Sequence, residues 1–471
     1  MKDLESRGAV VVEAGIAKTP AGRLPAEAAA AAEAAWRREP ADSVFRIGPE
    51  TTLAEVNALD LAPGSTVLFK RGCVWRGQLR VRSGVPGHPV RYGAWGEGVA
   101  PVLQPSLDAS SPSAWSDVGG ALWSFDSGAG ADVGNVVLGG GEDGCLFKRG
   151  SREALLRDRD FWFDPAGGKV VVRSEKGNPG ARWRSVELCR MLHGVDEAAA
   201  HDVEYEGLAV RYSAAHGFGG GGTARIAIRG CDVSWIGGGF LYFDDLGNGV
   251  RYGNGIELWG GAEDVSVENC TVRQCWDAGI TNQTNEPRSV QRRIVWRGNS
   301  VSECEYSYEF WHQGEGGIAE DVALEGNSMR DAGFGWGHAQ RWNPNAAHLM
   351  FYDTTVPTPG FRASGNAFGR TAGVGARIFN DWRGHASFSG NEWDVGSSPI
   401  CRFHGRPRSG LRHLYPDRLD RIHRDDASEI ESQGAGGFTI PATPEGRARF
   451  AALFAAAGIE DRRPRMPGSP R

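Results

Sequence analysis

The chain has 471 residues, a net charge of −6 and 23% charged residues, with no long basic run, so its composition argues against a nucleic-acid partner. Its 68 glycines, 16 tryptophans and 20 phenylalanines indicate a folded, turn-rich protein and not a disordered one. The 8 cysteines are too sparse and irregular to predict a disulfide framework or a metal site, and no run of 18 apolar residues predicts a membrane span.

The first part of the chain predicts a lead, a cap and an irregular region. Residues 1–43 predict a helical lead and no signal peptide, because glutamates interrupt the alanine run. Residues 44–118 predict an N-terminal cap, with a short helix at 53–61, and the first coils of a β-structure. Residues 119–190 predict an irregular β-insertion, with a hairpin at 161–174 across an AGG turn.

Residues 191–404 repeat a short phrase: GCDV, NCTV, GNSV, GNSM, GNAF and GNEW, each after an alternating apolar stretch. A turn that recurs in this way predicts a solenoid of stacked β-coils. The second residue of each phrase forms a predicted ladder of Leu208, Cys231, Cys270, Asn299, Asn327, Asn366 and Asn391. Two coils carry extra residues, at 237–253 and 341–360, which predict loops around a binding cleft. Residues 405–471 predict a tail with a helix from about Thr443 to Ala457.

These patterns resemble the pectate-lyase-like superfamily of parallel β-helix proteins, over about residues 45–400. The resemblance is carried by LAPGSTVLFKRGCVWRG, RDFWFDPAGGKVVVRSEKGNPG, the Asn ladder, and the NGIELW, DAGITNQ, YEFW and GWGHAQR strings. It implies an all-β fold, a single-stranded right-handed parallel β-helix, and an extracellular or periplasmic carbohydrate-active protein. VFRIGPETT stands where members have a glycine-rich turn, and the FWFD hairpin resembles an element of β-helix glycoside hydrolases.

Sequence register also predicts which side chains share the outer face of the coils, because equivalent positions stack in rows. Counting from the ladder predicts one row of Glu257, Thr281, Glu309, His338 and Arg377, and a second of Trp259, Gln283, Trp311 and Gln340. Strict counting buries Glu309 and exposes Phe310. Because burial of an unpaired carboxylate costs several kcal/mol, we predict a one-residue bulge that exposes Glu309 and Trp311.

The rows combine carboxylates, amides and tryptophans, which suit the binding of a sugar. Two carboxylates two coils apart are compatible with the chemistry of an inverting glycosidase. We predict Glu309 as the general acid and Asp277 or Glu257 as the base. The predicted substrate-binding residues are Trp259, Thr281, Asn282, Gln283, Trp311, His338, Gln340, Arg341, His348, Arg377 and Asp381.

Three functions remain open from the sequence. The first is a glycoside hydrolase that uses two carboxylates and no cofactor. The second is a polysaccharide lyase or uronate epimerase, in which His338 or Tyr308 takes the proton next to a uronate carboxylate, and Arg377 and Arg341, or a Ca²⁺ ion, neutralise that carboxylate. The third is a non-catalytic glycan-binding β-helix. In each case the expected partner is a carbohydrate, and the expected state is a monomer.

Overall fold

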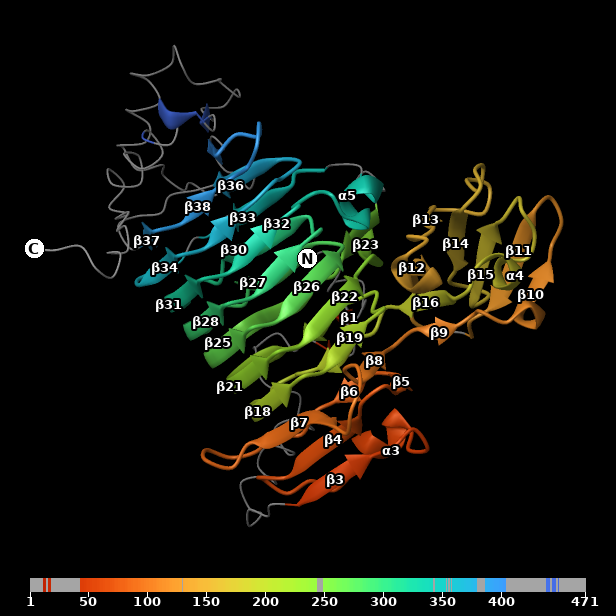
Figure 1. Ribbon diagram of the computed structural model, residues 1–471, viewed down its shortest axis with the longest axis horizontal. Helices are drawn as coiled ribbons and strands as arrows, with labels where there is room; N and C mark the ends of the chain where they lie inside the picture. The colour runs from red at the N-terminus through yellow and green to blue at the C-terminus, as the bar shows by residue number, and fades with distance from the viewer. Residues whose placement is uncertain are drawn as a thin grey trace, which may run out of the picture.

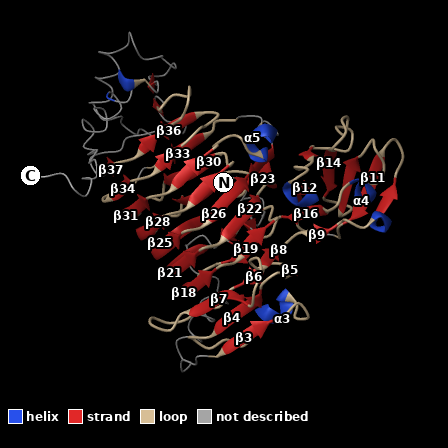
Figure 2. Ribbon diagram, viewed as in Figure 1, coloured by secondary structure: helices blue, strands red, loops and turns tan. Residues whose placement is uncertain are grey.

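Strands of successive coils pair in parallel and stack into a parallel β-helix (Figure 1), which confirms the predicted fold. Strands form nearly all of the regular structure, and the helices are few and short (Figure 2). The computed structural model describes residues 12–13, 16–17, 43–128, 130–243, 249–341, 344–352, 354, 356, 358–378, 386–403, 438–440, 443–445 and 448. The lead helix predicted within residues 1–43 lies outside these ranges, as does most of the tail helix predicted from Thr443 to Ala457.

Each complete coil passes through three strand faces, which we call A, B and C. Face A consists of β6 (Leu79–Arg80), β17 (Val195–Asp196), β20 (Phe218–Gly219), the start of β25 (Ile256–Glu268), β27 (Ala278–Thr284), β30 (Tyr306–His312), β33 (Ala347–Tyr352), β36 (Val374–Ile378) and β39 (Cys401–Phe403). Face B consists of β3 (Val44–Ile47), β4 (Thr66–Lys70), β7 (Val90–Trp95), β18 (His201–Glu206), β21 (Gly221–Arg229), the end of β25, β28 (Val290–Arg297), β31 (Ile318–Glu325), β34 (Phe361–Ser364) and β37 (Ala386–Ser389).

Face C closes the coil. It consists of β5 (Val74–Arg76), β8 (Val102–Gln104), β19 (Ala209–Arg211), β22 (Asp232–Ile236), β26 (Thr271–Cys275), β29 (Ser300–Ser302), β32 (Ser328–Arg330), β35 (Ala367–Phe368) and β38 (Glu392–Trp393). Two short antiparallel pairings involve the ends of the chain: β1 (Val12–Glu13) with β2 (Ile16–Ala17), and β40 (Phe438–Ile440) with β39.

A ladder of buried asparagines holds neighbouring coils in register at the turn before face C. The side-chain oxygen of Asn327 accepts a hydrogen bond from the backbone N–H of Asn299 at 2.9 Å. The Asn327 amide in turn donates to the Asn366 side-chain oxygen at 2.9 Å. Cys231 and Cys270 hold the same position in earlier coils, as predicted for the ladder, and are buried free thiols. Because buried polar groups are stable only when they are paired, the ladder fixes the repeat.

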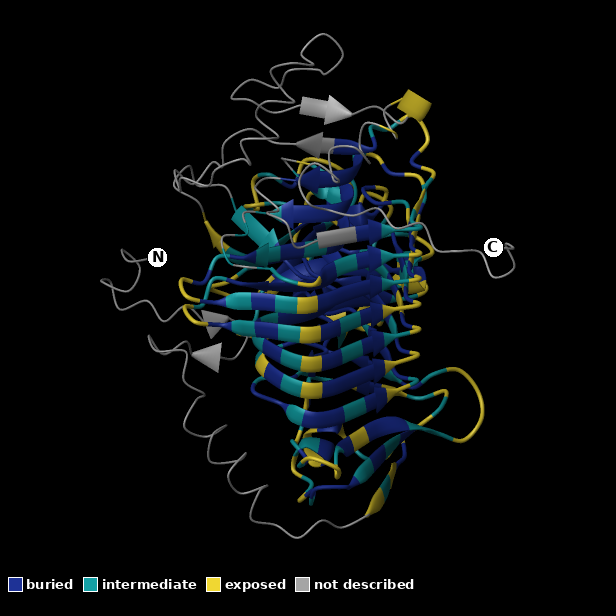
Figure 3. Cartoon of the chain, turned by 90° about the vertical axis from the view of Figure 1, so that its left-hand side faces the viewer, coloured by how far each residue is buried: buried dark blue, intermediate teal, exposed yellow. Residues whose placement is uncertain are grey.

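One apolar core runs through the coils, and its side chains come from all three faces. Figure 3 shows buried residues along the strands and exposed ones mainly at the turns. The core also encloses Glu197, which follows β17 and is 0% exposed. Burial raises the pKa of Glu197 to about 8; the nearby Tyr205 hydroxyl lowers it, and the charge of Asp196 raises it further.

The N-terminal end of the stack is covered by α3 (Leu53–Asn57), within the range predicted for a capping helix. Thr52 and Glu55 form a capping box, in which each side chain bonds the backbone N–H of the other residue. Leu53 and Val56 of this helix are buried against the first coils. Among the described residues, no helix is long and apolar enough to cross a membrane.

The connection from β8 to β17 forms a separate small unit, which we call the β-insertion. Its elements are β9 (Leu107–Asp108), η1 (Pro112–Ala114), β10 (Trp115–Asp117), β11 (Leu122–Asp126), β12 (Val133–Leu138), η2 (Gly139–Gly141), β13 (Phe147–Lys148), β14 (Asp160–Asp164), β15 (Lys169–Arg173), α4 (Pro179–Arg182) and β16 (Val186–Arg190). β14 and β15 pair as the predicted antiparallel hairpin. The β-insertion has an apolar core of its own.

Three long connections leave the stack at one corner, between face C and face A (Figure 1). They are the β-insertion, residues 237–255 with the hairpin of β23 (Gly239–Phe243) and β24 (Gly249–Tyr252), and residues 331–346 with α5 (Trp336–Gln340). The two coils between the second and third of these have short connections, residues 276–277 and 303–305. Little of the chain therefore projects from the corner at these two coils, whereas long connections project from the corner on both sides of them.

Candidate active site

Two glutamates lie in one outward row of face A, two coils apart. The register pairs Glu257 with Thr281 and Thr281 with Glu309, and the row continues to Met350 and Arg377. Since paired strands are about 4.8 Å apart, the backbones of the two glutamates are about 10 Å apart. Four of the five residues predicted for this row, Glu257, Thr281, Glu309 and Arg377, are in the predicted register.

The one-residue shift that exposes Glu309 lies in a turn, so the predicted bulge within the strand is wrong. Arg273 pairs with Ser302 on face C, and Ala278 pairs with Tyr306 on face A. The later coil therefore has one residue fewer between these two strands. From Ala278 onward the pairing of β27 with β30 has a constant register. A shorter corner reverses which side chains point outward, as a bulge would.

A second outward row carries two tryptophans. Trp259 pairs with Gln283 and Gln283 with Trp311. The Trp259 and Trp311 rings are 5.7 Å apart between centroids, and both side chains are half-buried. The Trp259 indole N–H donates to Glu286 at 3.1 Å. Half-buried indoles on the outer face offer flat apolar surfaces on which a ring can stack.

His338 and Gln340 do not lie in these rows, so their predicted register is wrong. Met350 and Tyr352 occupy the two positions instead. The GWGHAQR string forms α5 within the third long connection, and β33 begins only at Ala347. The extra residues of this coil therefore lie mainly at 331–346, earlier than the predicted loop at 341–360.

Two further carboxylates lie at the low part of the corner. Asp277 precedes β27 directly and Glu305 precedes β30 directly, and the backbone N–H of Glu305 donates to the Asp277 carbonyl oxygen at 3.0 Å. The Asp277 side chain is 24% exposed, whereas that of Glu305 is 0% exposed. Glu305 was missed in the sequence, although aligning the two strands would have placed it level with Asp277.

The Arg341 guanidinium contacts both of these carboxylates. One guanidinium nitrogen lies 2.7 Å from Asp277 Oδ1, and its Nε lies 3.8 Å from Glu305 Oε2. The guanidinium also lies over the Trp276 ring, 4.9 Å from its centroid. His338 of α5 completes the group, with its Nδ1 2.8 Å from Glu305 Oε2. The predicted residues Asp277, His338 and Arg341 thus come together through Glu305.

Glu257 has a separate set of partners. Its Oε2 lies 2.5 Å from His216 Nδ1 and accepts a hydrogen bond from the Asn254 side chain at 2.9 Å. His216 stacks on His193, with 5.1 Å between the ring centroids. Glu257 is only 5% exposed. His193 and His216 were not predicted as site residues, because they lie in coils that precede the counted rows.

The three other carboxylates of this site differ in proton affinity. Burial raises the pKa of Glu309 well above its ordinary value, and the charge of Asp277 raises it further. Burial also raises the pKa of Asp277, against the opposing charge of Arg341. For Glu305, burial raises the pKa, but the hydrogen bond with His338 and the charge of Arg341 outweigh burial, so its pKa is lowered. Glu309 therefore keeps a proton to higher pH than an ordinary glutamate.

Several predicted binding residues have structural partners instead. Asn282 is 0% exposed and accepts a hydrogen bond from the Tyr308 hydroxyl in the core. His348 is also 0% exposed, with Ser307 on one ring nitrogen and the Gly369 carbonyl oxygen on the other. These two side chains face inward, so the prediction that they bind substrate is wrong.

The predicted binding residue Thr281 also has a structural partner. The Thr281 hydroxyl donates to the backbone oxygen of Glu309 at 2.8 Å, and the residue is 0% exposed although it belongs to the row. It therefore supports Glu309 and is not presented to solvent. Asp381 lies outside the described residues.

Side chains from all three long connections meet beside the carboxylates. The Gln340 amide donates to the Leu146 carbonyl oxygen of the β-insertion at 2.8 Å, and its oxygen accepts from Arg251 of β24 at 3.1 Å. Arg251 also donates to Gly134 of the β-insertion at 2.8 Å. Its guanidinium lies 3.8 Å from the Trp276 ring centroid. Gln340 therefore links the three long connections to one another and is not a member of the face A row.

No group of three or more His, Cys, Asp and Glu side chains in the described part of the chain is arranged as metal ligands. The sequence matches no protein-family model and no curated protein.

Among solved structures, the chain is similar to a glycoside hydrolase at 10% identity and a TM-score of 0.48, over 76% of this chain and 89% of the other. It is similar to a rhamnogalacturonan lyase at 10% identity and a TM-score of 0.39, over 89% of this chain and 99% of the other. A lacto-N-biosidase from Eubacterium ramulus is similar at 14% identity and a TM-score of 0.35, over 80% and 67%. The reaction of this chain must therefore be inferred from its own side chains.

Proposed function

We propose that the protein is a carbohydrate-active enzyme that hydrolyses a glycosidic bond with two carboxylates. The observation that carries this proposal is the contrast between Glu309 and Asp277. Burial raises the pKa of both groups, but it raises that of Glu309 well above its ordinary value, whereas Arg341 bonds Asp277 directly at 2.7 Å and its charge opposes the rise. A protonated and an ionised carboxyl on one surface are the pair that glycoside hydrolysis requires.

In this mechanism Glu309 is the general acid. It gives its proton to the glycosidic oxygen as the bond from that oxygen to the anomeric carbon breaks. Asp277 is the base and takes a proton from the water whose oxygen bonds to the same carbon. Asp277 suits this role better than Glu257, because 24% of its side chain is exposed, whereas Glu257 is 5% exposed and bonded by both His216 and Asn254.

The second row supplies a binding surface for the sugar. Trp259 and Trp311 lie two residues beyond Glu257 and Glu309 along the same strands. We expect their half-buried rings to stack on pyranose faces next to the carboxylates.

Elimination from a uronate receives less support. The Tyr308 hydroxyl, a predicted base, is bonded to Asn282 in the core and is 0% exposed. Arg341, a predicted neutraliser of the substrate carboxylate, already bonds Asp277. The carboxylate of a uronate would also be repelled by the ionised side chains of Asp277 and Glu305.

The test is incubation of the protein with neutral and acidic polysaccharides, with reducing ends and the absorbance of unsaturated uronates both recorded. We expect new reducing ends without unsaturated product. Glu309→Gln and Asp277→Asn should each lower turnover by roughly 100-fold or more, the usual contribution of a general acid or base. The control is Glu268→Gln, which removes a carboxylate from face B of the same strand as Glu257 and should leave turnover unchanged.

Unsaturated product would replace hydrolysis by elimination. Saturable binding without turnover of any bound glycan would favour a non-catalytic glycan-binding β-helix. Full activity of Glu309→Gln would remove Glu309 from the mechanism.

A further inference from the structure

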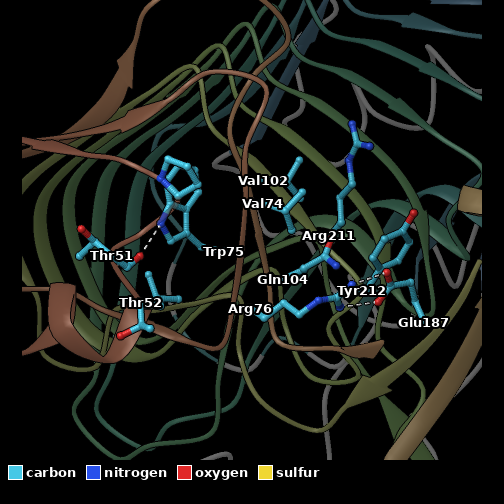
Figure 4. A pocket seen from close by; sticks show the side chains of 12 residues that line it. Thr51, Thr52, Val74, Trp75, Arg76, Val102, Gln104, Glu187, Arg211 and Tyr212 are labelled. Carbon is cyan, nitrogen blue, oxygen red and sulfur yellow. Dashed lines mark hydrogen bonds and ion pairs between the residues drawn. The ribbon is translucent and has the colours of Figure 1, made fainter. Parts of the chain in front are cut away.

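A hollow lies near the N-terminal end of the stack, apart from the carboxylates. It is an open pocket of about 510 Å³, within the roughly 300–1,000 Å³ typical of small-molecule sites. Its lining comes from the start of α3, from β5, β8 and β19 of face C, and from β16 of the β-insertion. In Figure 4 the bonded pair Thr51 and Trp75 lies on one side and the bonded pair Arg76 and Glu187 on the other.

The pocket presents two hydrogen-bonding side chains, Gln104 and Tyr212. Neither the Gln104 carboxamide nor the Tyr212 hydroxyl has a hydrogen-bond partner among the described residues, although these residues are only 3% and 6% exposed. The polar atoms of both side chains remain accessible from the pocket, so a ligand that enters it can bond them. A carboxamide and a hydroxyl are both able to donate and to accept, which suits a ligand rich in hydroxyl groups.

The pocket also has an apolar side. Val74 is 50% exposed and pairs with Val102 of the next coil, which also lines the pocket. An exposed branched side chain beside polar groups fits a ligand with one apolar face and a polar edge. A pyranose ring has this character, because its C–H groups form a face and its hydroxyls project from the edge.

The charges of the pocket offset each other. Arg76 bonds Glu187 with two nitrogens, at 2.7 and 2.8 Å, and lies 3.3 Å from Asp108. Arg211 lies 3.2 Å from Asp232. Since each guanidinium already faces a carboxylate, the pocket has no excess of positive charge that would favour an anionic ligand.

From these features we propose that the pocket binds a neutral sugar unit and is a glycan-binding site separate from the carboxylates of face A. Gln104 and Tyr212 bond the hydroxyls, and Val74 contacts the apolar face of the ring. The proposal rests on the chemistry of this pocket and not on the proposed hydrolysis.

The experiment measures binding of neutral methyl glycosides of glucose, galactose and xylose by calorimetry, with galacturonate as the charged comparison. The protein carries Glu309→Gln in every case, so that turnover does not interfere. Val74→Trp should fill the pocket and weaken binding by about tenfold or more, since the new indole occupies the volume of the ligand. Tyr212→Phe, which removes one hydroxyl and keeps the ring, should weaken binding by about fivefold through the loss of one hydrogen bond.

Val44→Trp is the matched control. Val44 is a similarly exposed valine of β3, at 58%, and does not line the pocket. Its substitution should leave the affinity unchanged and shows whether an added surface tryptophan acts by itself. The proposal is overturned if no neutral glycoside binds, if Val44→Trp and Val74→Trp behave alike, or if galacturonate binds most tightly. It is also overturned if Asp277→Asn abolishes binding while Val74→Trp does not, because binding then occurs at the face A carboxylates.

Discussion

The buried Glu197 predicts an unusual dependence of stability on pH. Its pKa is about 8 in the folded protein, against an ordinary value of 4.5, chiefly because of burial. At about 1.36 kcal/mol per pH unit, this difference is worth about 5 kcal/mol of unfolding free energy. Below pH 4.5 the carboxyl is protonated in both states, and its full contribution to stability is present.

Stability from this residue is lost as pH rises from 4.5 to 8. In that window the unfolded chain releases the proton and the folded protein keeps it, so ionisation favours unfolding. Above pH 8 both states are ionised and the loss is complete. Glu197→Gln has no such titration, and we expect it to match the natural protein near pH 4.5 and to exceed it by about 4–5 kcal/mol at pH 9.

The assay is urea-induced unfolding at pH 5, 7 and 9, followed by tryptophan fluorescence. Glu325→Gln provides a comparison of opposite sign: although burial raises its pKa, hydrogen bonds and charges from Arg297 and Arg362 outweigh burial and lower it. Its titration lies below its ordinary pKa of 4.5, so its loss should destabilise the protein by a similar amount at pH 5, 7 and 9. A difference between Glu197→Gln and the natural protein that stays constant from pH 5 to 9 would refute the reasoning.

Two further predictions concern the ladder and the corner. Asn327→Ala should lower the unfolding free energy by about 3–5 kcal/mol in a denaturant titration, because it leaves several buried groups of neighbouring coils unpaired. Asn391→Ala, at the end of the ladder, should lower it by less, and an equal loss would contradict the ladder's role. Arg341→Gln removes the charge that lowers the pKa of Asp277 and Glu309, so the acidic limb of the pH–activity profile should move to higher pH. Arg370→Gln, which breaks an exposed pair with Asp331, is the control. An acidic limb that does not move in Arg341→Gln would count against Asp277 as the base.

The repeat in the sequence was sufficient to predict the fold and most of the face A rows. Asparagine turns mark each coil, and strand register transfers from coil to coil wherever the connections keep their length. Glu257 and Glu309 were placed in one row for this reason. Even the exposure of Glu309 followed from the energetic cost of burying a carboxylate, although the shift lies in a turn and not in a bulge.

The errors in register arise where a connection changes length. His338 and Gln340 were counted into strands because a strand was assumed at a fixed distance from the ladder, whereas residues 331–346 first form α5. Glu305 was missed because its corner is one residue shorter than that of Asp277. The contacts of α5 with the β-insertion join residues almost 200 positions apart, and no periodicity encodes them.

Because the three long connections all leave the stack at one corner, their length and sequence are separate from the register of the strands. A connection that begins and ends at neighbouring strand ends tolerates insertion without moving any strand out of register. Exchange of residues 237–255 or 331–346 would therefore alter the surroundings of the carboxylates and leave their mutual spacing to the coils. The coils therefore set the spacing of the carboxylates, and the connections at one corner set which substrates reach them.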